Sequence, residues 1–133
     1  MAWIGIVNSD THAVIPVAAY GYEDGYLSNI SISIDAIPQG MGLTGTSIRE
    51  GHLVISSDIA SDPLMAQYRE QAEQRGYRSS ASIPLYCDDR IMGAMRFYSG
   101  EKNFFNEQEI QLLETLAGDI SYALEYTDAG TFE

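Results

Sequence analysis

The feature that most constrains the fold of this chain is a pair of apolar runs, "SSASIPLY" and "RIMGAMRFYS", which lie between residues 79 and 99. Each run carries the aliphatic and aromatic residues typical of strands, and the polar stretch "CDDR" links them. Two strands joined by so short a polar turn are predicted to form a β-hairpin. A hairpin at this point requires a sheet with antiparallel pairing.

A second hairpin is predicted at the start of the chain, where "AWIGIVN" and "AVIPVAAYG" flank the turn "NSDTH". Pro16 indicates an edge strand or a bulge. "ISISID" alternates strictly and "HLVISSDI" is rich in β-branched residues, so both are predicted to be extended. Helices are predicted at "TSIRE", over residues 61–76 and over residues 106–126. This order predicts an α+β fold, a central antiparallel β-sheet with helices on both faces.

The last helix carries the strongest local signals. Asn106 can cap it, and Glu109 at the third helical position completes a capping-box pattern. One apolar stripe is predicted to face the core, and it consists of Ile110, Leu113, Ala117, Ile120 and Leu124. A second stripe widens the apolar surface and consists of Leu112, Leu116 and Ala123. We expect a homodimer that pairs through this C-terminal helix.

Composition excludes several classes of function. A chain of 133 residues with a net charge of −12 predicts one domain that neither nucleic acid nor an anionic membrane surface attracts. No run approaches the roughly 18 apolar residues of a membrane span, and the first residues lack the basic region of a signal peptide. The single cysteine, Cys87, excludes an internal disulfide and a cysteine metal cluster. Together these features favour a cytoplasmic domain.

Three of the seven basic residues, Arg69, Arg75 and Arg78, fall within ten positions. They form either a site for an anionic ligand or a solvated helix face paired with Glu70 and Glu73. Catalytic chemistry has no support, since no histidine stands near a nucleophile in a known motif. No set of histidine, aspartate and glutamate has metal-ligand spacing. We therefore expect no enzyme activity, no metal and no cofactor.

The motifs resemble the GAF domain family. They are "GMGLTGTSIREGHLVISSDIASDP", "GYRSSASIPLYCDDRIMGAMRFYS" and "FFNEQEIQLLETLAGDISYALE", which together span most of the chain. The resemblance implies a GAF/PAS-like domain over residues 1–127, followed by a tail at 128–133, with the first helix of that fold absent. It also implies terminal helices on one face of the sheet and a small-molecule pocket on the other. "MAWIG" and "DISYALE" look like GAF domains found beside diguanylate cyclase and cyclic di-GMP phosphodiesterase domains.

The function implied is a non-catalytic regulatory domain of a bacterial signal-transduction protein. It would sense a small anionic or aromatic molecule and act on an output domain through its terminal helices. The alternative is a dimerisation module with a vestigial pocket. The implied pocket walls are Trp3, Met65, Tyr68, Tyr77 and Met95, and the implied polar contacts are Asp58, Arg69, Arg78, Ser79 and Ser80. Asp58 can equally cap a turn, and the tyrosine and methionines can equally be core residues.

Specific GAF chemistries fit the residues poorly. Bilin-binding relatives need a cysteine near the pocket and a proline where this chain has Ala60, whereas Cys87 belongs to the far hairpin. Free methionine sulfoxide reductases need more than one cysteine. The stretch "EKNFFNEQE" matches cyclic-nucleotide-binding relatives only weakly. Neither His12 nor His52 is placed to bind haem.

Overall fold

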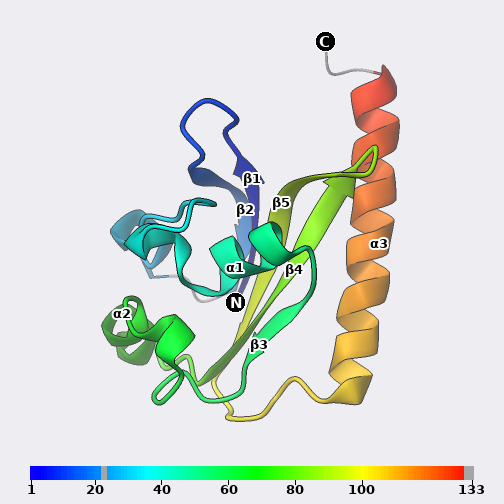
Figure 1. The fold of residues 1–133 in the computed structure, drawn as a ribbon. Coiled ribbons are helices and arrows are strands. Elements are labelled where there is room, and N and C mark those ends of the chain that lie inside the picture. The colour runs from blue at the N-terminus through cyan, green and yellow to red at the C-terminus, as the bar shows by residue number, and fades with distance from the viewer. Residues whose placement is uncertain (22–23, 131–133) are drawn as a thin grey trace.

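The computed structural model describes residues 1–21 and 24–130, apart from the side chains of Asn29 and residues 125–130. One five-stranded sheet organises the chain, with the strand order β2-β1-β5-β4-β3 and antiparallel pairing between all neighbours (Figure 1). This confirms the predicted α+β class. The strands are β1 (Ala2–Val7), β2 (Val14–Tyr20), β3 (Val54–Ser56), β4 (Ser79–Cys87) and β5 (Arg90–Ser99).

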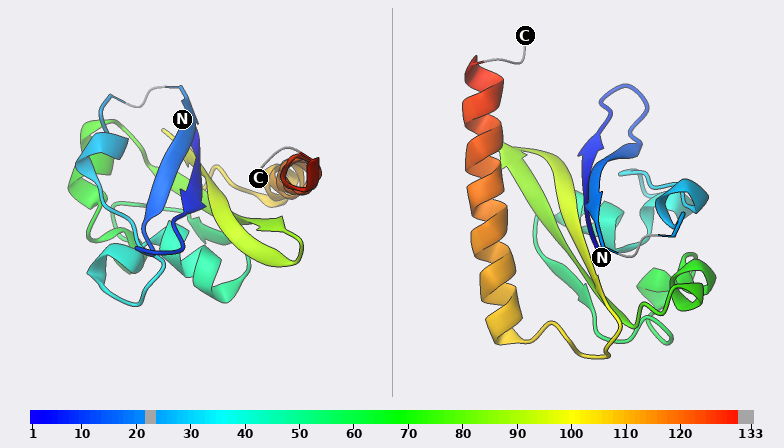
Figure 2. Two further views of the ribbon diagram at one scale, coloured as in Figure 1. Left: turned by 90° about the horizontal axis from the view of Figure 1, so that it is seen from above. Right: turned by 180° about the vertical axis from the view of Figure 1, so that it is seen from behind.

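Helices cover both faces of the sheet (Figure 2). One face carries α3 (Glu107–Gly130), which packs along β4. This helix runs through residues 128–130 of the predicted tail, and residues 131–133 lie outside the described part. The other face carries α1 (Leu43–Glu50), which packs on β3, β4 and β5. The shorter helices on that side are η1 (Leu27–Asn29), η2 (Pro38–Gly40), η3 (Pro63–Met65) and α2 (Arg69–Gln74).

Side chains of β4 and β5 alternate between two separate cores, as a strand requires. On the α3 face, Ile83, Leu85 and Met95 pack with Ala117. On the α1 face lies a larger core that holds most of the buried aromatic residues. Its fully or nearly fully buried members include Trp3, Tyr26, Leu43, Ile59, Met65 and Tyr77.

Two predicted elements differ from the structure. The helix predicted over residues 61–76 is broken into η3 and α2, because Tyr68 leaves the helical region at φ −107° and ψ 0°. Asp62 caps η3, and its carboxylate accepts the Leu64 N–H at 2.9 Å. The stretch "ISISID" forms no strand and contributes one isolated bridge, between Ala13 and Ser33.

The core-facing stripe of α3 is confirmed. Leu113 and Ala117 are buried, and Ile120 and Leu124 pack against the sheet core. In the second stripe, Leu112 stays 64% exposed and Leu116 41% exposed. An apolar strip therefore remains open to solvent along the helix.

The start of α3 is capped by one half of the predicted capping box. Asn106 Oδ1 accepts the Glu109 N–H at 3.1 Å, while the Asn106 N–H donates to the Phe104 carbonyl instead of to Glu109.

Replacing Asn106 by alanine should lower the free energy of unfolding by about 1 kcal/mol, because the Glu109 N–H loses its acceptor. Urea denaturation would measure the loss. Asn106→Asp is the control and should retain the stability, and an equal loss in both variants would contradict the capping role.

Candidate functional site

Arg96 lies near the middle of β5, and its side chain points to the α1 face of the sheet, where it is only 2% exposed. Its Nη1 donates to Thr44 Oγ1 at 2.9 Å, and its Nη2 donates to Ser80 Oγ at 2.7 Å. The Nε–H has no hydrogen-bond partner among the described residues. A guanidinium that is buried with a free donor is costly, and such groups call for an explanation.

The charge of Arg96 also has no counter-ion, since none of the ion pairs found among the described residues involves it. Its Cζ lies 4.6 Å from the ring centroid of Tyr98, a cation–π contact. Its Nη2 also lies 3.9 Å from Met65 Sδ, which is a weak acceptor. These neighbours compensate for lost hydration only in part, because a buried cation is normally paired with an anion.

Aromatic side chains form one wall beside Arg96. The rings of Tyr26, Tyr77 and Tyr98 contact one another with centroid separations of 4.7–5.3 Å. Trp3 Nε1 donates to Tyr98 Oη at 3.4 Å, and Tyr98 Oη lies 3.4 Å from Tyr26 Oη. Burial raises the pKa of Tyr26 far above its usual value and also raises that of Tyr68. These phenols therefore stay neutral and can donate hydrogen bonds.

Residues 24–42, here called the covering segment, close the site between β2 and α1. Side chains rather than strand pairing hold most of this segment. Tyr68 Oη donates to the carbonyls of Gln39 at 2.7 Å and Ser31 at 3.1 Å. Arg75 Nη2 donates to the Asp24 carbonyl at 2.7 Å.

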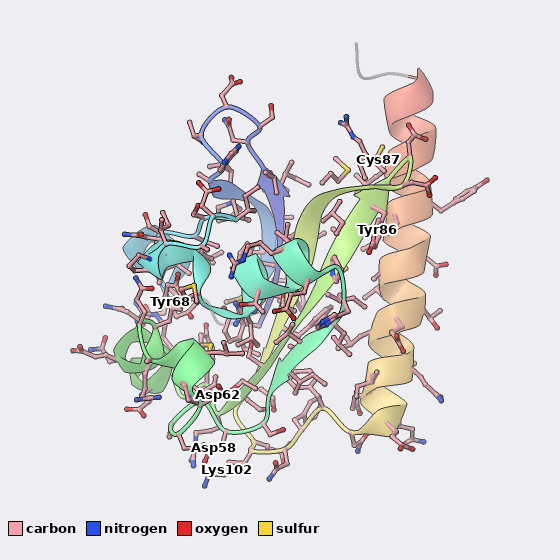
Figure 3. All side chains as sticks on the ribbon, viewed as in Figure 1. Asp58, Asp62, Tyr68, Tyr86, Cys87 and Lys102 are labelled. Atoms are coloured by element: carbon pink, nitrogen blue, oxygen red, sulfur yellow. The ribbon has the colours of Figure 1, made fainter. Side chains whose placement is uncertain are left out.

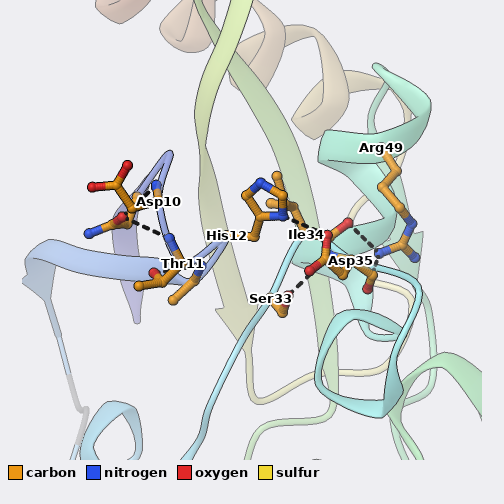
Figure 4. Close-up of polar contacts among 9 residues, drawn as sticks. Asp10, Thr11, His12, Ser33, Ile34, Asp35 and Arg49 are labelled. Atoms are coloured by element: carbon orange, nitrogen blue, oxygen red, sulfur yellow. Dashed lines mark hydrogen bonds and ion pairs between the residues drawn. The ribbon is translucent and has the colours of Figure 1, made fainter.

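Two further contacts hold the outer side of the covering segment (Figure 4). Arg49 Nη1 donates to the carbonyls of Ile34 and Asp35. His12, in the turn before β2, places its Nδ1 at 2.9 Å from Asp35 Oδ1. The side chains of His12 and Asp35 are both about half exposed, so their contact lies at the surface. Backbone hydrogen bonds from the Val14 N–H to the Ile32 carbonyl and from the Ile34 N–H to the His12 carbonyl add to these side-chain contacts. A segment outside the strand ladder can open locally without loss of the sheet.

The space beneath the covering segment is closed. Its lining side chains meet without leaving room for a water molecule, and they are Tyr26, Ile30, Ile32, Gln39, Gly42, Thr44, Gly45, Tyr68 and Arg96. Gly42 permits the close approach of Tyr68, because a Cβ atom there would lie 2.6 Å from Tyr68 Cε2. Any guest must therefore displace part of the covering segment or of the η3–α2 stretch.

Replacing Tyr68 by phenylalanine should loosen the covering segment, because the carbonyls of Ser31 and Gln39 lose their shared donor. We expect the free energy of unfolding to fall by about 1 kcal/mol. Hydrogen exchange should quicken at the amides of Ser33 and Gly40, which bond within the segment. The exposed Tyr122 provides a matched control as Tyr122→Phe. Unchanged exchange at both amides in Tyr68→Phe would show that the hydroxyl does not hold the segment.

The structure brings together half of the site residues predicted from the sequence. Trp3, Met65, Tyr68, Tyr77 and Ser80 all lie in the α1-face core or contact Arg96. Ser80 Oγ also donates to the Phe97 carbonyl at 2.7 Å. Its hydroxyl thus accepts from the arginine and donates to the backbone, which fixes its position.

The other predicted site residues lie elsewhere. Met95 packs on the α3 face because it neighbours Arg96 in an alternating strand. Ser79 donates to the Glu101 carbonyl at 2.6 Å. Arg69 donates to the carbonyls of Ile59 and Asp62, so it braces a turn. The Arg78 side chain is exposed.

Asp58 is also outside the pocket and serves a surface turn near Lys102 (Figure 3). Its carboxylate accepts from Ser61 Oγ at 3.1 Å and lies 3.5 Å from Lys102 Nζ. Desolvation acts to raise the pKa of Asp58, but the Ser61 hydrogen bond and the Lys102 charge outweigh it and hold that pKa below its usual value. This supports the turn-capping interpretation, the alternative already open from the sequence.

Arg96 itself is absent from the predicted site, whose basic residues all come from the cluster at 69–78. The signal that identifies it is alternation in "GAMRFYS". Since Met95 and Phe97 face one side of the sheet, Arg96 must share the opposite side with Ala94 and Tyr98. A basic residue at an inward position of a central strand is rarely buried unless it has a specific partner.

No group of three or more histidine, cysteine, aspartate or glutamate residues in the described part of the chain could hold a metal ion. Cys87 lies at the end of β4 beside α3, away from Tyr68 and the covering segment (Figure 3). None of the helices in the described ranges is long and apolar enough to span a membrane.

Comparison with known proteins gives a family match over most of the chain. The family model described as "GAF domain" matches residues 1–125. A search of curated protein sequences gives no match.

Solved structures with the same fold include the GAF domain of a phosphoenolpyruvate-protein phosphotransferase from Coxiella burnetii, with 18% identity and a TM-score of 0.77, covering 96% of this chain and 73% of that one. A domain of a protein described as a two-component sensor histidine kinase from Sinorhizobium meliloti has 17% identity and a TM-score of 0.75, with coverage of 96% and 80%. Free methionine-R-sulfoxide reductase from Neisseria meningitidis, in complex with its substrate, has 20% identity and a TM-score of 0.75, with coverage of 98% and 70%. At these identities the likeness shows the fold alone.

Proposed function

Because the chain belongs to the GAF domain family, we propose that it is a non-catalytic sensor domain of a bacterial signalling protein. In this proposal a small molecule binds beneath the covering segment, against the α1 face of the sheet. Binding changes the packing of that segment, and the terminal helix transmits the change to an attached output domain.

The observation that carries the proposal is the state of Arg96. This guanidinium is 2% exposed, lacks a counter-ion among the described residues and keeps an unpartnered Nε–H. Small-molecule sites are largely apolar and hold a few placed polar groups. One buried cation beside three packed tyrosines is such an arrangement.

Coupling to an output requires that the ligand bind two arrangements of the domain with different affinity. The closed arrangement in the structure has no room for a guest, so a bound state must differ from it. Met65 and Tyr68 connect the site to η3 and α2, and Tyr68 also holds the covering segment. A ligand that moves either residue therefore changes the packing of two segments at once.

Thermal unfolding in the presence of fractionated small-molecule extract from bacterial cells tests the proposal. A ligand that binds only the folded state raises the midpoint, and the stabilisation grows with the logarithm of its concentration over its Kd. We expect at least one fraction to stabilise the domain. If every fraction leaves the midpoint unchanged, sensing through this pocket is contradicted.

The closed space favours a second candidate, a dimerisation module with a vestigial pocket. Tyr68 lines that space at 6% exposure, and the fully buried Met65 contacts Arg96 beside it. In this alternative Arg96 is a structural residue, and the function lies in α3. A stable dimer that no small molecule stabilises would support it.

Both candidates propose a homodimer through the exposed stripe of α3. Replacing Leu112 and Leu116 by aspartate should convert a dimer into a monomer, because both side chains would lose their apolar contact and bring like charges together. Light scattering over a range of concentrations measures the mass. Asp119→Asn, on the same helix, is the control and should remain dimeric. A monomeric wild-type domain at high concentration would remove this part of the proposal.

We further propose that the output domain makes or degrades cyclic di-GMP and that the protein acts in the cytoplasm. The support is the resemblance carried by "MAWIG" and "DISYALE" and the acidic, cysteine-poor composition. An enzyme of the methionine sulfoxide reductase type is disfavoured, because such thiol exchange needs more than one cysteine. A thiol-dependent reductase activity that Cys87→Ser abolishes would reverse this assignment.

A further inference from the structure

We propose that the ligand of this domain is a small monocarboxylate with a flat apolar body, and that Arg96 binds its carboxylate. The inference rests on the proposed function, since it assigns a chemical class to the same pocket. It follows from which donors of Arg96 are engaged in the closed state.

A guanidinium has five N–H donors in a planar fork. In the closed state one bond goes to Thr44, one to Ser80 and one weak contact to Met65 Sδ at 3.9 Å, while Nε has none. The edge formed by Nε and Nη2 is the side through which arginine binds both oxygens of a carboxylate. A carboxylate at this edge would engage the free Nε–H and replace the thioether of Met65.

A second buried group without a partner lies on the same face of the sheet, next to Ser80. Ser56 on β3 is paired directly with Ser80 on β4, so their side chains share the face that holds Arg96. Ser56 is fully buried, and its Oγ has no hydrogen-bond partner among the described residues. The site therefore offers a hydroxyl donor as well as a cation to an entering oxygen.

The charge balance favours a monoanion. Among the described residues Arg96 is the one cation that lines the closed space, since Arg49, Arg69 and Arg75 turn to backbone carbonyls instead. A phosphate monoester carries close to two negative charges near neutral pH and three acceptor oxygens. One guanidinium balances the charge of a single carboxylate but not the charge of a phosphate monoester. The net charge of −12 makes an unbalanced anion still less favourable.

The side chains around Arg96 indicate the chemistry of the rest of the ligand. Tyr26 lines the closed space with Arg96, the ring of Tyr98 lies against the guanidinium, and Tyr77 contacts both of these rings. Aromatic walls favour flat apolar bodies, through stacked and edge-to-face contacts. Benzoate is thus a suitable probe, and benzamide is its neutral match in shape.

The direct test follows the Arg96 Nε–H signal in a nitrogen-proton correlation spectrum of the wild-type domain. The signal is assigned by its loss in Arg96→Lys. We expect benzoate to shift it saturably, while benzamide at the same concentration leaves it in place. The Kd for benzoate should rise about tenfold or more in Arg96→Lys, since lysine lacks the planar fork. Arg90→Lys, at the exposed start of the same strand, should retain the affinity.

Three outcomes would overturn the inference. One is no shift with benzoate, and another is an equal shift with benzamide. The third is a shift of the Arg96 Nε–H signal when inorganic phosphate is added without benzoate. If Arg96→Lys does not fold, loss of the signal in Arg96→Met assigns it instead, and the wild-type comparison stands. A cell-extract fraction that stabilises wild type and Arg96→Lys alike would leave the sensor function standing while this inference fails.

Discussion

Replacing Arg96 by methionine is expected to raise the free energy of unfolding of the ligand-free domain by about 1–4 kcal/mol, as when buried charged groups are replaced by apolar ones of similar volume. The guanidinium loses its hydration on folding and gains only two hydroxyl acceptors, a thioether and one ring face. Methionine fills a similar volume and leaves no charge to bury. A residue that costs stability and yet holds a central place in the pocket is best explained by binding.

Urea denaturation of the wild type and Arg96→Met would measure the difference in their free energies of unfolding. The free energy should fall with urea concentration at the same slope in both proteins. Arg90→Met, on the same strand but exposed, is the matched control and should change stability little. If Arg96→Met instead lowers the free energy of unfolding by more than about 1 kcal/mol, the bonds of Arg96 are structural. That result would favour the dimerisation module over the sensor.

Replacing Gly45 by alanine is expected to lower the free energy of unfolding by about 1–3 kcal/mol, the usual cost of overpacking. A Cβ atom at this position would lie 2.3 Å from the Gly40 carbonyl oxygen and 2.7 Å from that of Ser33. Both atoms are backbone of the covering segment, so the segment itself must move. The clash should outweigh the gain in helix propensity within α1.

Gly118→Ala in α3 is the matched control. No atom lies within 4 Å of the Cβ it would add, so only helix propensity changes. We expect its free energy of unfolding to rise by about 0.5–1 kcal/mol. Opposite signs for the two glycines in thermal or urea unfolding would support close packing of α1 on the covering segment. A stabilising Gly45→Ala would contradict it.

The sheet and the terminal helix were predictable because their signals are local. Alternation identifies β4 and β5, and a polar turn joins them. The cap at Asn106 and the stripe through Leu113 and Ala117 specify α3. The covering segment was not predictable, since its alternating "ISISID" is held by Tyr68 and Arg49 from distant positions.

The candidate site was predicted in part for a related reason. The family resemblance predicted polar contacts at the strand start, Ser79 and Ser80, and at the arginines of the middle helix. Only Ser80 of these contacts Arg96, because neighbouring residues of a strand face opposite sides. The middle helix breaks at Tyr68, and that break turns Arg69 toward backbone carbonyls. Such tertiary contacts leave no periodic trace in a sequence.

In the proposed sensor, a small molecule binds at Arg96. Native mass spectrometry of the wild-type domain and Arg96→Met, each incubated with the same small-molecule extract, tests it most directly. Our account predicts an added mass on the wild type that denaturation releases, absent from Arg96→Met and retained in Arg90→Met. Identical spectra for wild type and Arg96→Met, whether bare or loaded, would contradict it.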